Sequence, residues 1–386
     1  MIPYGRQNVT QADIDAVVEV LRSDFLTQGP AVPQFEQAVR SSVGALYAIA
    51  VNSATSALHV ACMALGLGTG DRLWTVPNTF VASANCGRYC GASVDFVDID
   101  PFTWNLSVPA LREKLEQAKR EQRLPKVLVP VHFAGQPTDQ EEIWDLANSY
   151  GFKVLEDASH AIGASRNGER VGSCRWSDIT VFSFHPVKIV TSGEGGMALT
   201  NDRELARRMV MLRSHGITRD AAHLRLQDPP PWYYEQQLLG FNYRMTDIHA
   251  ALGGSQLRRL EECVARRNAL AGRYDTALQG LPLQLPTVRA QNRSAFHLYV
   301  VRLKSDAGAK TQRQVMSELR QRGMGVNLHY LAVHLQPYYR DLGFSAGQFP
   351  RAEAYANSAF SLPLYPDLTT QMQDQVVAAV RQTLVC

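Results

Sequence analysis

Long hydrophobic runs and an excess of one charge are both missing from this chain. Its longest apolar runs fall far short of the roughly 18 residues that a membrane-spanning helix requires. Its 39 Lys and Arg residues nearly balance its 36 Asp and Glu residues. A protein that binds nucleic acid would carry a basic excess or a basic stripe, so this balance argues against that class. The first residues, MIPYGRQ, also lack the apolar core of a signal peptide.

A C-x-x-C pair of cysteines is missing as well. The six cysteines are scattered along the chain, and no two of them form a C-x-x-C motif. Zinc sites and disulfide frameworks usually show such regular spacing. Cys62 and Cys86 lie in apolar sequence, which is typical of small core residues. We therefore expect a reduced, cytoplasmic protein that has no structural disulfide and binds no metal.

Strand patterns and helix patterns alternate along the first half of the chain. Strands are expected at residues 47–51, 72–76, 93–98, 126–132, 152–156, 179–184 and 197–200. Helical patterns separate most of them, at residues 54–65, 80–89, 108–121 and 140–150. This alternation predicts an α/β fold with a mostly parallel seven-stranded sheet and helices on both of its faces.

The second half of the chain predicts a smaller C-terminal α+β domain. One long helix is expected at 250–278, followed by a strand at 296–303, a helix at 312–322, a strand at 325–329 and a helix at 371–384. The large domain would span residues 1–250, and the bridging helix with the small domain would span residues 251–386. With 386 residues and 45% apolar composition, the chain is long enough to bury both cores.

One lysine follows a predicted buried strand at the start of a glycine-rich turn. Residues 182–196 read FSFHPVKIVTSGEGG, and Lys188 is the lysine among these apolar and small residues. Most lysines are solvated surface residues. A partly desolvated lysine instead has a lowered pKa and can form a Schiff base with an aldehyde. The pattern alone leaves both interpretations open.

Two further stretches place polar groups after predicted strands. Asp157 lies at the carboxyl end of a strand, where open α/β sheets bind ligands. Its carboxylate would pair with a protonated pyridine nitrogen or would simply cap the next helix. Residues 52–58 read NSATSAL and open a helix. The free N–H groups of that helix start suit a phosphate, although an ordinary serine-rich N-cap has the same pattern.

Together these stretches resemble the DegT/DnrJ/StrS family of sugar aminotransferases, which use pyridoxal phosphate (PLP). The resemblance runs nearly end to end and implies the fold type I aminotransferase architecture. Besides the Lys188 stretch, the matching motifs are LTQGP (26–30), FE (35–36), NSATSALH (52–59), PNTFVASAN (77–85), VHFAGQP (131–137), EDASHAIGA (156–164), FNYRMTDI (241–248) and SLPLYPDLT (361–369).

The resemblance implies three catalytic residues. Lys188 would hold PLP as a Schiff base and later act as general base and acid. Asp157 would face the pyridine nitrogen, and His160 would lie near the ring, where the family often has glutamine. The other implied cofactor contacts are Ala54, Thr55, Ser183 and Asn242 at the phosphate and Phe80 over the ring. Asn242 would reach the cofactor of a second copy, which implies a homodimer with shared active sites.

The resemblance also implies the substrate. The segments SFHPVK, RSHGI and PWYYEQQLLGFNYRM are similar to those of the pseudaminic acid branch. Enzymes of that branch aminate C4 of a UDP-linked 4-keto-6-deoxy-N-acetyl hexose, and L-glutamate is the implied amino donor. The implied substrate contacts are Tyr4, Thr27, Arg244, His329 and Tyr330. His297 and His334 are interpreted as structural, because histidines are often buried and hydrogen-bonded.

Three other functions remain as alternatives. The first is an aminotransferase for another nucleotide sugar, linked to dTDP or GDP and acting at C4 or C3. The second is the dehydratase branch of the family, but that branch replaces the lysine with histidine, and Lys188 argues against it. The third is a PLP-binding regulator. The regulators carry an added DNA-binding domain, for which this chain has neither an extra module nor a basic stripe.

Overall fold

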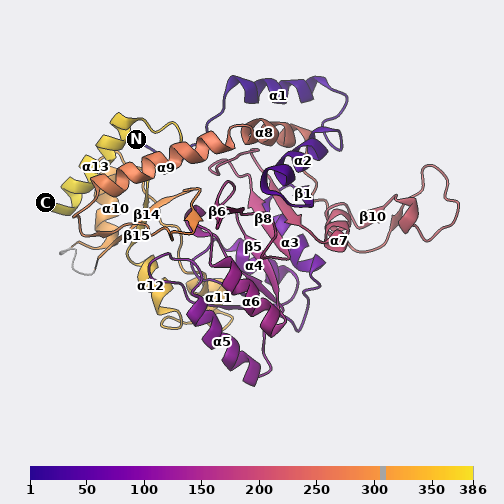
Figure 1. Ribbon diagram of the computed structural model, residues 1–386, viewed down its shortest axis with the longest axis horizontal. Helices are drawn as coiled ribbons and strands as arrows, with labels where there is room; N and C mark the ends of the chain where they lie inside the picture. The colour runs from indigo at the N-terminus through magenta and orange to yellow at the C-terminus, as the bar shows by residue number, and fades with distance from the viewer. Residues whose placement is uncertain (305–309, 386) are drawn as a thin grey trace.

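A computed structural model of the chain describes residues 1–304 and 310–385. At its centre lies a seven-stranded sheet with the order β1-β9-β8-β5-β4-β2-β3 (Figure 1). The strands from β8 to β3 are parallel, and β9 is antiparallel to both of its neighbours. The mostly parallel seven-stranded sheet is therefore confirmed. Its strands are Tyr47–Val51 (β1), Arg72–Thr75 (β2), Ser93–Phe96 (β3), Val127–Val129 (β4), Lys153–Asp157 (β5), Ile179–Ser183 (β8) and Gly196–Thr200 (β9).

Helices cover both faces of this sheet, because alternate side chains of a strand point to opposite faces. On β8, Val181 packs into one apolar core and its neighbour Phe182 packs into another. The first core lies under α3 (Ala54–Ala64), α4 (Ala82–Tyr89), α5 (Val108–Arg120), α6 (Gln140–Tyr150) and α7 (Arg203–Arg213). The second core lies under α2 (Ala31–Val43) and α8 (Asp247–Leu257).

A third core belongs to the C-terminal part of the chain. An antiparallel sheet is formed there by β12 (Leu283–Gln284), β14 (Tyr299–Leu303) and β15 (Ala359–Leu362). The helices α10 (Gln312–Gln321) and α13 (Thr370–Val385) pack into this third core, whereas the short α11 (Pro337–Arg340) and α12 (Pro350–Ala356) pack against the first core. Figure 1 shows α9 (Leu260–Ala277) leading from the large sheet to these elements.

The predicted single helix at residues 250–278 is wrong, because the structure has two helices there. α8 ends at Leu257 and α9 begins at Leu260. Between them the backbone leaves helical geometry at Arg259 (φ −102°, ψ 11°). The Arg259 guanidinium turns to the buried carboxylate of Asp13 on α1 (Gln11–Arg22), 2.7 Å away. The apolar positions continue across the break, so periodicity could not reveal it.

The predicted strand at residues 325–329 is also wrong. Only one isolated bridge joins this segment to a strand, between Asn327 and Ser361 of β15. The side chain of Asn327 accepts a hydrogen bond from the N–H of Leu328 (3.0 Å), which removes that donor from any ladder. The segment therefore forms a loop.

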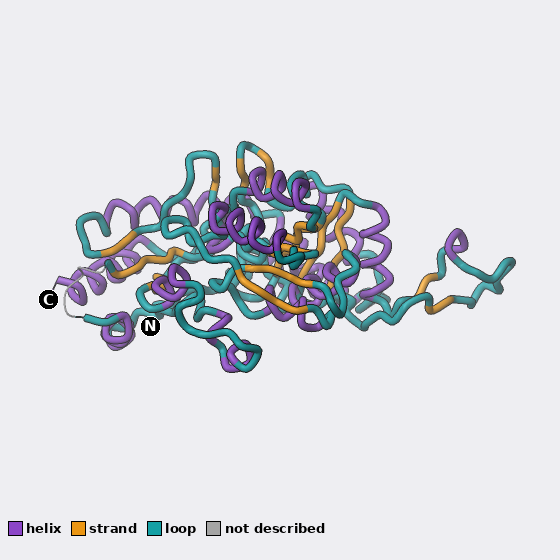
Figure 2. The backbone as a smooth tube through the Cα atoms, turned by 90° about the horizontal axis from the view of Figure 1, so that it is seen from below, coloured by secondary structure: helices purple, strands orange, loops and turns teal. Residues whose placement is uncertain are grey.

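Residues 214–240 contain a short hairpin that projects from the body. Its strands are β10 (Ile217–Thr218) and β11 (Glu235–Gln236), and Figures 1 and 2 show it reaching away from every other element. Trp232 is 79% exposed, and Leu239 is 77% exposed. We call residues 217–236 the arm. Such apolar exposure is typical of surfaces that dock onto another molecule.

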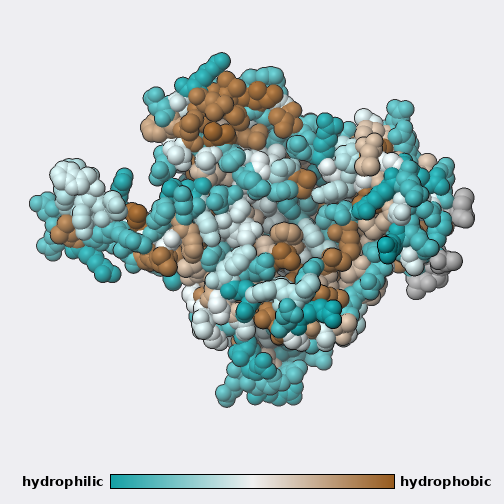
Figure 3. Space-filling view, turned by 180° about the vertical axis from the view of Figure 1, so that it is seen from behind, coloured by the Kyte–Doolittle hydropathy of each residue, from teal (hydrophilic) through white to brown (hydrophobic). Residues whose placement is uncertain are grey.

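A second exposed apolar surface lies over α1. Figure 3 shows a hydrophobic patch at the top of the molecule, the end at which Figure 1 places α1. The exposed apolar side chains on α1 and just after it are Ile14, Leu21, Phe25 and Leu26. The side chain of Asp13 caps this helix by accepting a hydrogen bond from the backbone N–H of Thr10 (2.8 Å). Within the described residues, no helix has the length and apolar character of a membrane span.

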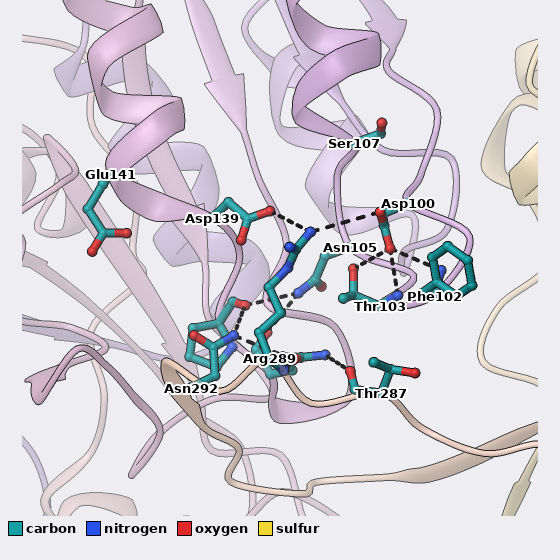
Figure 4. A network of polar contacts seen from close by, with 12 residues as sticks. Asp100, Phe102, Thr103, Asn105, Ser107, Asp139, Glu141, Thr287, Arg289 and Asn292 are labelled. Atoms are coloured by element: carbon teal, nitrogen blue, oxygen red, sulfur yellow. Dashed lines mark hydrogen bonds and ion pairs between the residues drawn. The ribbon is translucent and has the colours of Figure 1, made fainter.

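A polar network ties the segment before β14 to loops of the large sheet (Figure 4). Arg289 forms an ion pair with Asp139 (3.0 Å), and the amide of Gln136 donates to the carbonyl of Thr287 (2.9 Å). Asn292 donates to the carbonyl of Pro137 (2.9 Å) and lies on β13 (Asn292–Arg293), which pairs with β6 (Ser165–Arg166) beside β7 (Glu169–Arg170). These contacts fix the residues that follow, including His297, against the large sheet.

Candidate active site

A cavity of about 400 Å³ opens at the carboxyl ends of the parallel strands. Ligand sites usually have volumes of roughly 300–1,000 Å³, and open α/β sheets place them at this edge. Ten of the thirteen predicted site residues line it. They are Tyr4, Ala54, Thr55, Phe80, Asp157, His160, Ser183, Lys188, His329 and Tyr330. Residues far apart in the sequence therefore meet in one cavity.

Lys188 extends into this cavity from the loop between β8 and β9. Its backbone N–H donates to the carbonyl of His185 (2.9 Å), which closes a turn around Pro186. Burial lowers the pKa of the Lys188 amine to about 8, and the carboxylate of Asp157 opposes part of that shift. A substantial fraction of the amine is therefore neutral near pH 8, and a neutral amine is both a nucleophile and a base.

Asp157 ends β5 and is held by two hydrogen bonds. Its Oδ1 atom accepts from the N–H of Ser159 (3.1 Å), and its Oδ2 atom accepts from the hydroxyl of Ser83 on α4 (2.6 Å). The Ser83 hydroxyl in turn contacts that of Thr79 (2.8 Å), and Thr79 lines the cavity. The carboxylate is 5% exposed, so its orientation is fixed by these partners. Sequence analysis missed Ser83 and Thr79.

His160 is a neutral imidazole whose tautomer can be assigned. Burial, followed by the charges of Lys188 and His329, lowers the pKa of His160 well below its ordinary value. Its Nδ1 atom lies 3.3 Å from the N–H of Ala134, which can only donate, so the proton of the ring is on Nε2. That Nε2–H donates to the hydroxyl of Tyr330 (3.2 Å). The Tyr330 hydroxyl is left with its own proton to donate elsewhere.

The start of α3 offers the groups that a phosphate requires. Ser53 is the N-cap, and its side chain accepts from the N–H of Ser56 (3.1 Å), so Ala54 and Thr55 occupy the first turn beside the cavity. The first N–H groups of a helix are free to bind an anion. A side chain at Gly196 would lie 2.4 Å from the backbone nitrogen of Ala54, so only glycine allows this approach of β9.

Two further histidines lie at the cavity wall. His297, interpreted above as structural, lines the cavity, and its ring lies 4.4 Å from that of His160. His329 shares a hydrogen bond with the hydroxyl of Ser361 (2.8 Å), and burial together with the charge of Lys188 lowers its pKa to about 4. The other predicted structural histidine, His334, contacts Glu353 instead (3.0 Å).

Three predicted residues do not line the cavity of their own chain. The backbone of Arg244 pairs with that of Val51, and the backbone of Thr27 pairs with that of Thr246. The N–H of Asn52 donates to the carbonyl of Tyr243 (2.8 Å), which brings the segment containing Asn242 alongside the start of α3. The side chain of Asn242 is nevertheless exposed.

The donor set of the cavity fits PLP. Lys188 supplies an amine for the aldehyde, Asp157 a carboxylate for the ring nitrogen, and the first turn of α3 with Ser183 the donors for the phosphate. This arrangement on a mostly parallel seven-stranded sheet defines a PLP-dependent enzyme of fold type I.

The family follows from comparison with known proteins. A model of the DegT/DnrJ/EryC1/StrS aminotransferase family matches residues 7–381. The chain belongs to this family and is a PLP-dependent sugar aminotransferase. It is 40% identical over 383 residues to the spore coat polysaccharide biosynthesis protein SpsC of Bacillus subtilis, covering 98% of this chain and 96% of that protein.

Two solved structures resemble the whole chain. PseC of Helicobacter pylori, an aminotransferase involved in the biosynthesis of pseudoaminic acid, has a TM-score of 0.90 and 28% identity, covering 100% of this chain and 99% of PseC. The putative sugar aminotransferase Spr1654 of Streptococcus pneumoniae, in its PMP form, has a TM-score of 0.89 and 27% identity, covering 100% and 99%. The pyridoxamine form of that relative agrees with the expected cofactor.

Proposed function

We propose that this enzyme transfers the amino group of L-glutamate to C4 of a UDP-linked 4-keto-6-deoxy-N-acetyl hexose in the biosynthesis of a surface polysaccharide or of pseudaminic acid. The observation that carries the proposal is the full-length likeness to PseC, at a TM-score of 0.90. The similarity to SpsC supports a role in polysaccharide biosynthesis. The five described cysteines are free thiols, which supports the proposed cytoplasmic location.

The residues of the cavity divide the chemistry among them. PLP, when bound, supplies the electron sink for the carbanion that transamination requires. Lys188 would hold its aldehyde, and the neutral amine would move a proton when the amino donor has displaced it. Asp157 would keep a positive charge on the ring nitrogen, fixed in place by Ser83. The Nδ1 atom of His160 carries no proton, and its Nε2–H would donate to the Tyr330 hydroxyl. That hydroxyl would then be free to donate its own proton to the ligand.

The sugar would bind on the side of the cavity lined by Tyr4, His329 and Tyr330. The rings of Tyr4 and His329 lie 5.1 Å apart, and the ring of Phe80, a residue that is 57% exposed, lies 6.1 Å from that of Tyr330. Aromatic faces of this kind suit stacking on the cofactor ring and on a sugar. Thr27 and Arg244 would contact the substrate only after assembly with a second copy.

We further propose a homodimer with shared sites and a domain boundary near residue 250. The exposed side chain of Asn242, next to the start of α3, supports a contact with the phosphate bound by a second copy. The projecting arm would dock onto that copy. The separate third core supports a small domain at residues 251–386, although Ile2 of the N-terminal segment joins it.

The substrate is tested with UDP-, dTDP- and GDP-linked 4-keto sugars, with the product identified by NMR. We expect a 4-amino product from the UDP-linked N-acetyl sugar. Preferential amination of a dTDP- or GDP-linked sugar would establish the alternative instead. Bleaching of the visible absorbance by L-glutamate tests the donor, and Lys188→Ala should abolish this bleaching. Wild-type bleaching in that variant would contradict the role of Lys188.

A further inference from the structure

His297 lines the cavity, and its buried Nδ1 atom has no hydrogen-bond partner among the described residues. The residue is 5% exposed, and its ring centroid lies 4.4 Å from that of His160. Burial, followed by the charges of His160 and Lys188, lowers the pKa of His297 well below its ordinary value, so the ring is neutral. Because a buried N–H without an acceptor is rare, the ring proton is assigned to Nε2. His297 therefore carries an Nε2–H that can donate to a ligand in the cavity.

The backbone that carries His297 is strained and closely packed. Phe296, the residue before it, has a φ of 44°, in a region that non-glycine residues rarely adopt. The N–H of Ala295 donates to the carbonyl of Gly135 (2.9 Å), and a side chain at Gly135 would lie 2.8 Å from the nitrogen of Phe296. Such strain costs free energy, and in proteins it clusters at ligand sites and catalytic sites. The conformation therefore indicates that the place of His297 in the cavity wall serves binding.

A buried positive charge lies behind His297. Arg267 on α9 is 2% exposed. Its Nη1 atom donates to the backbone carbonyls of Phe296 (3.2 Å), His297 (3.2 Å) and Leu364 (3.0 Å). Its Nε atom has no partner within the described residues, and no carboxylate there offsets the lowering of its pKa to about 10 by burial. A buried cation without a counter-charge favours an anion nearby.

We propose that His297 binds a carboxylate of the amino donor through its Nε2–H, and that the charge of Arg267 behind it favours this anion. Among the described residues that line the cavity, Lys188 is the only lysine and none is an arginine. Lys188 would hold the cofactor, so a carboxylate needs another donor. The positive surroundings that lower the pKa of His297 also attract an anion. This inference rests on the proposed function only in that the amino donor carries a carboxylate.

The experiment measures the binding of glutarate, a dicarboxylate without an amino group, to the full-length enzyme loaded with PLP. Calorimetry gives the Kd. A hydrogen bond to a charged group is lost in His297→Leu, so the Kd should rise about tenfold. His297→Gln keeps an N–H close to the position of Nε2 and should restore most of the affinity.

The kinetics of the half-reaction with L-glutamate separate binding from folding. In His297→Leu the KM for L-glutamate should rise with the Kd for glutarate, whereas kcat changes little. The matched control is His334→Leu, because His334 is also buried but contacts Glu353 outside the cavity. That variant should have a lower melting temperature and an unchanged KM.

Unchanged glutarate affinity in folded His297→Leu would overturn the proposal. So would weaker PLP binding with unchanged glutarate affinity, because His297 would then bind the phosphate of the cofactor. If the variant fails to fold, a crystal structure of the wild-type holoenzyme with glutarate decides. We expect a carboxylate oxygen within roughly 3.2 Å of Nε2, and a carboxylate bound elsewhere overturns the proposal. No sugar enters these measurements, so a failed sugar assay would contradict the proposed function and leave this inference standing.

Discussion

At the scale of single residues, the cavity depends on side chains that hold other side chains. Asp157 faces the cavity with both oxygens already hydrogen-bonded, to Ser83 and to the backbone of Ser159. His160 is likewise fixed by Ala134 on one side and Tyr330 on the other. Preorganised groups of this kind stabilise developing charge without having to reorient during the reaction.

Removing the Ser83 hydroxyl should slow catalysis without unfolding the protein. A hydrogen bond to a charged group contributes roughly 1.5–3 kcal/mol. If Ser83→Ala loses about half of that in the transition state, kcat falls about tenfold, the equivalent of about 1.4 kcal/mol. The visible spectrum of the bound cofactor should shift as well, because Asp157 is then free to rotate.

The control for this variant is Ser255→Ala. Ser255 is also buried and hydrogen-bonded, on α8, to Arg258 (3.1 Å). Its loss should change the melting temperature but leave the spectrum unchanged. Equal effects of the two variants on kcat would contradict a positioning role for Ser83.

The neutral fraction of Lys188 should control how fast the apoenzyme takes up PLP. Only the neutral amine attacks the aldehyde, so the rate should rise with pH, with a midpoint near 8, and level off above it. Asp157 raises this pKa, so Asp157→Asn should move the midpoint to lower pH. Absorbance during reconstitution measures both, and a midpoint near 10 would show that the amine is solvated.

Sequence patterns made Lys188 and Asp157 candidates, because each lies at or after the end of a recognisable strand, and the family resemblance gave them their roles. The positions of Ser83 and His297 in the site could not be predicted from such patterns. Their contacts arise only when α4 and the segment before β14 fold against β5. Thr79 precedes α4, so its contact with Ser83 comes from the turn that leads into the helix and not from helical spacing.

At the scale of elements, local patterns predict the strands of the large sheet, whereas long-range and side-chain contacts decide one helix break and one loop. All seven strands of the large sheet were predicted, because apolar runs between helical patterns mark buried parallel strands. The break between α8 and α9 was missed, because an ion pair from Arg259 to distant Asp13 accompanies it. The loop at residues 325–329 was mistaken for a strand, because a side chain binds its backbone.

Gly196→Ala should disrupt the contact between β9 and the start of α3. Its added carbon would lie 2.4 Å from the nitrogen of Ala54 and 2.5 Å from the carbonyl carbon of Ser53. Overpacking usually costs about 1–3 kcal/mol, so we expect a lower melting temperature and weaker PLP binding.

The matched control is Gly68→Ala, because no atom lies within 4 Å of the position that its added carbon would occupy. This variant should keep the wild-type melting temperature and cofactor affinity. Unchanged PLP affinity in Gly196→Ala would show that the start of α3 can shift without loss of the phosphate site.

At the scale of the whole molecule, two exposed apolar surfaces support the proposed homodimer. The arm exposes Trp232, and the patch over α1 exposes Leu21 and Phe25 (Figures 1 and 3). Asn242 lies beside the start of α3 yet outside the cavity of its own chain. A second copy that completes the site would cover apolar surface of this kind.

Shared sites predict that two inactive variants restore activity when they are mixed. Lys188→Ala removes the amine, and Asn242→Asp places a negative charge against the phosphate. After co-refolding, a mixed dimer would contain one doubly altered site and one intact site. Roughly a quarter of wild-type activity should therefore return after random pairing into two-fold dimers. No recovery would indicate that each chain completes its own site.

The antiparallel direction of β9 also limits how the loop that carries Lys188 can move. β9 is antiparallel to β8, so the chain leaves and re-enters the sheet at the same edge, with Lys188 on the short return between them. Both strands are interior, each hydrogen-bonded on two sides. The loop thus cannot swing as a hinged flap, and amide hydrogen exchange at its two roots should be slow, occurring only when the sheet itself opens.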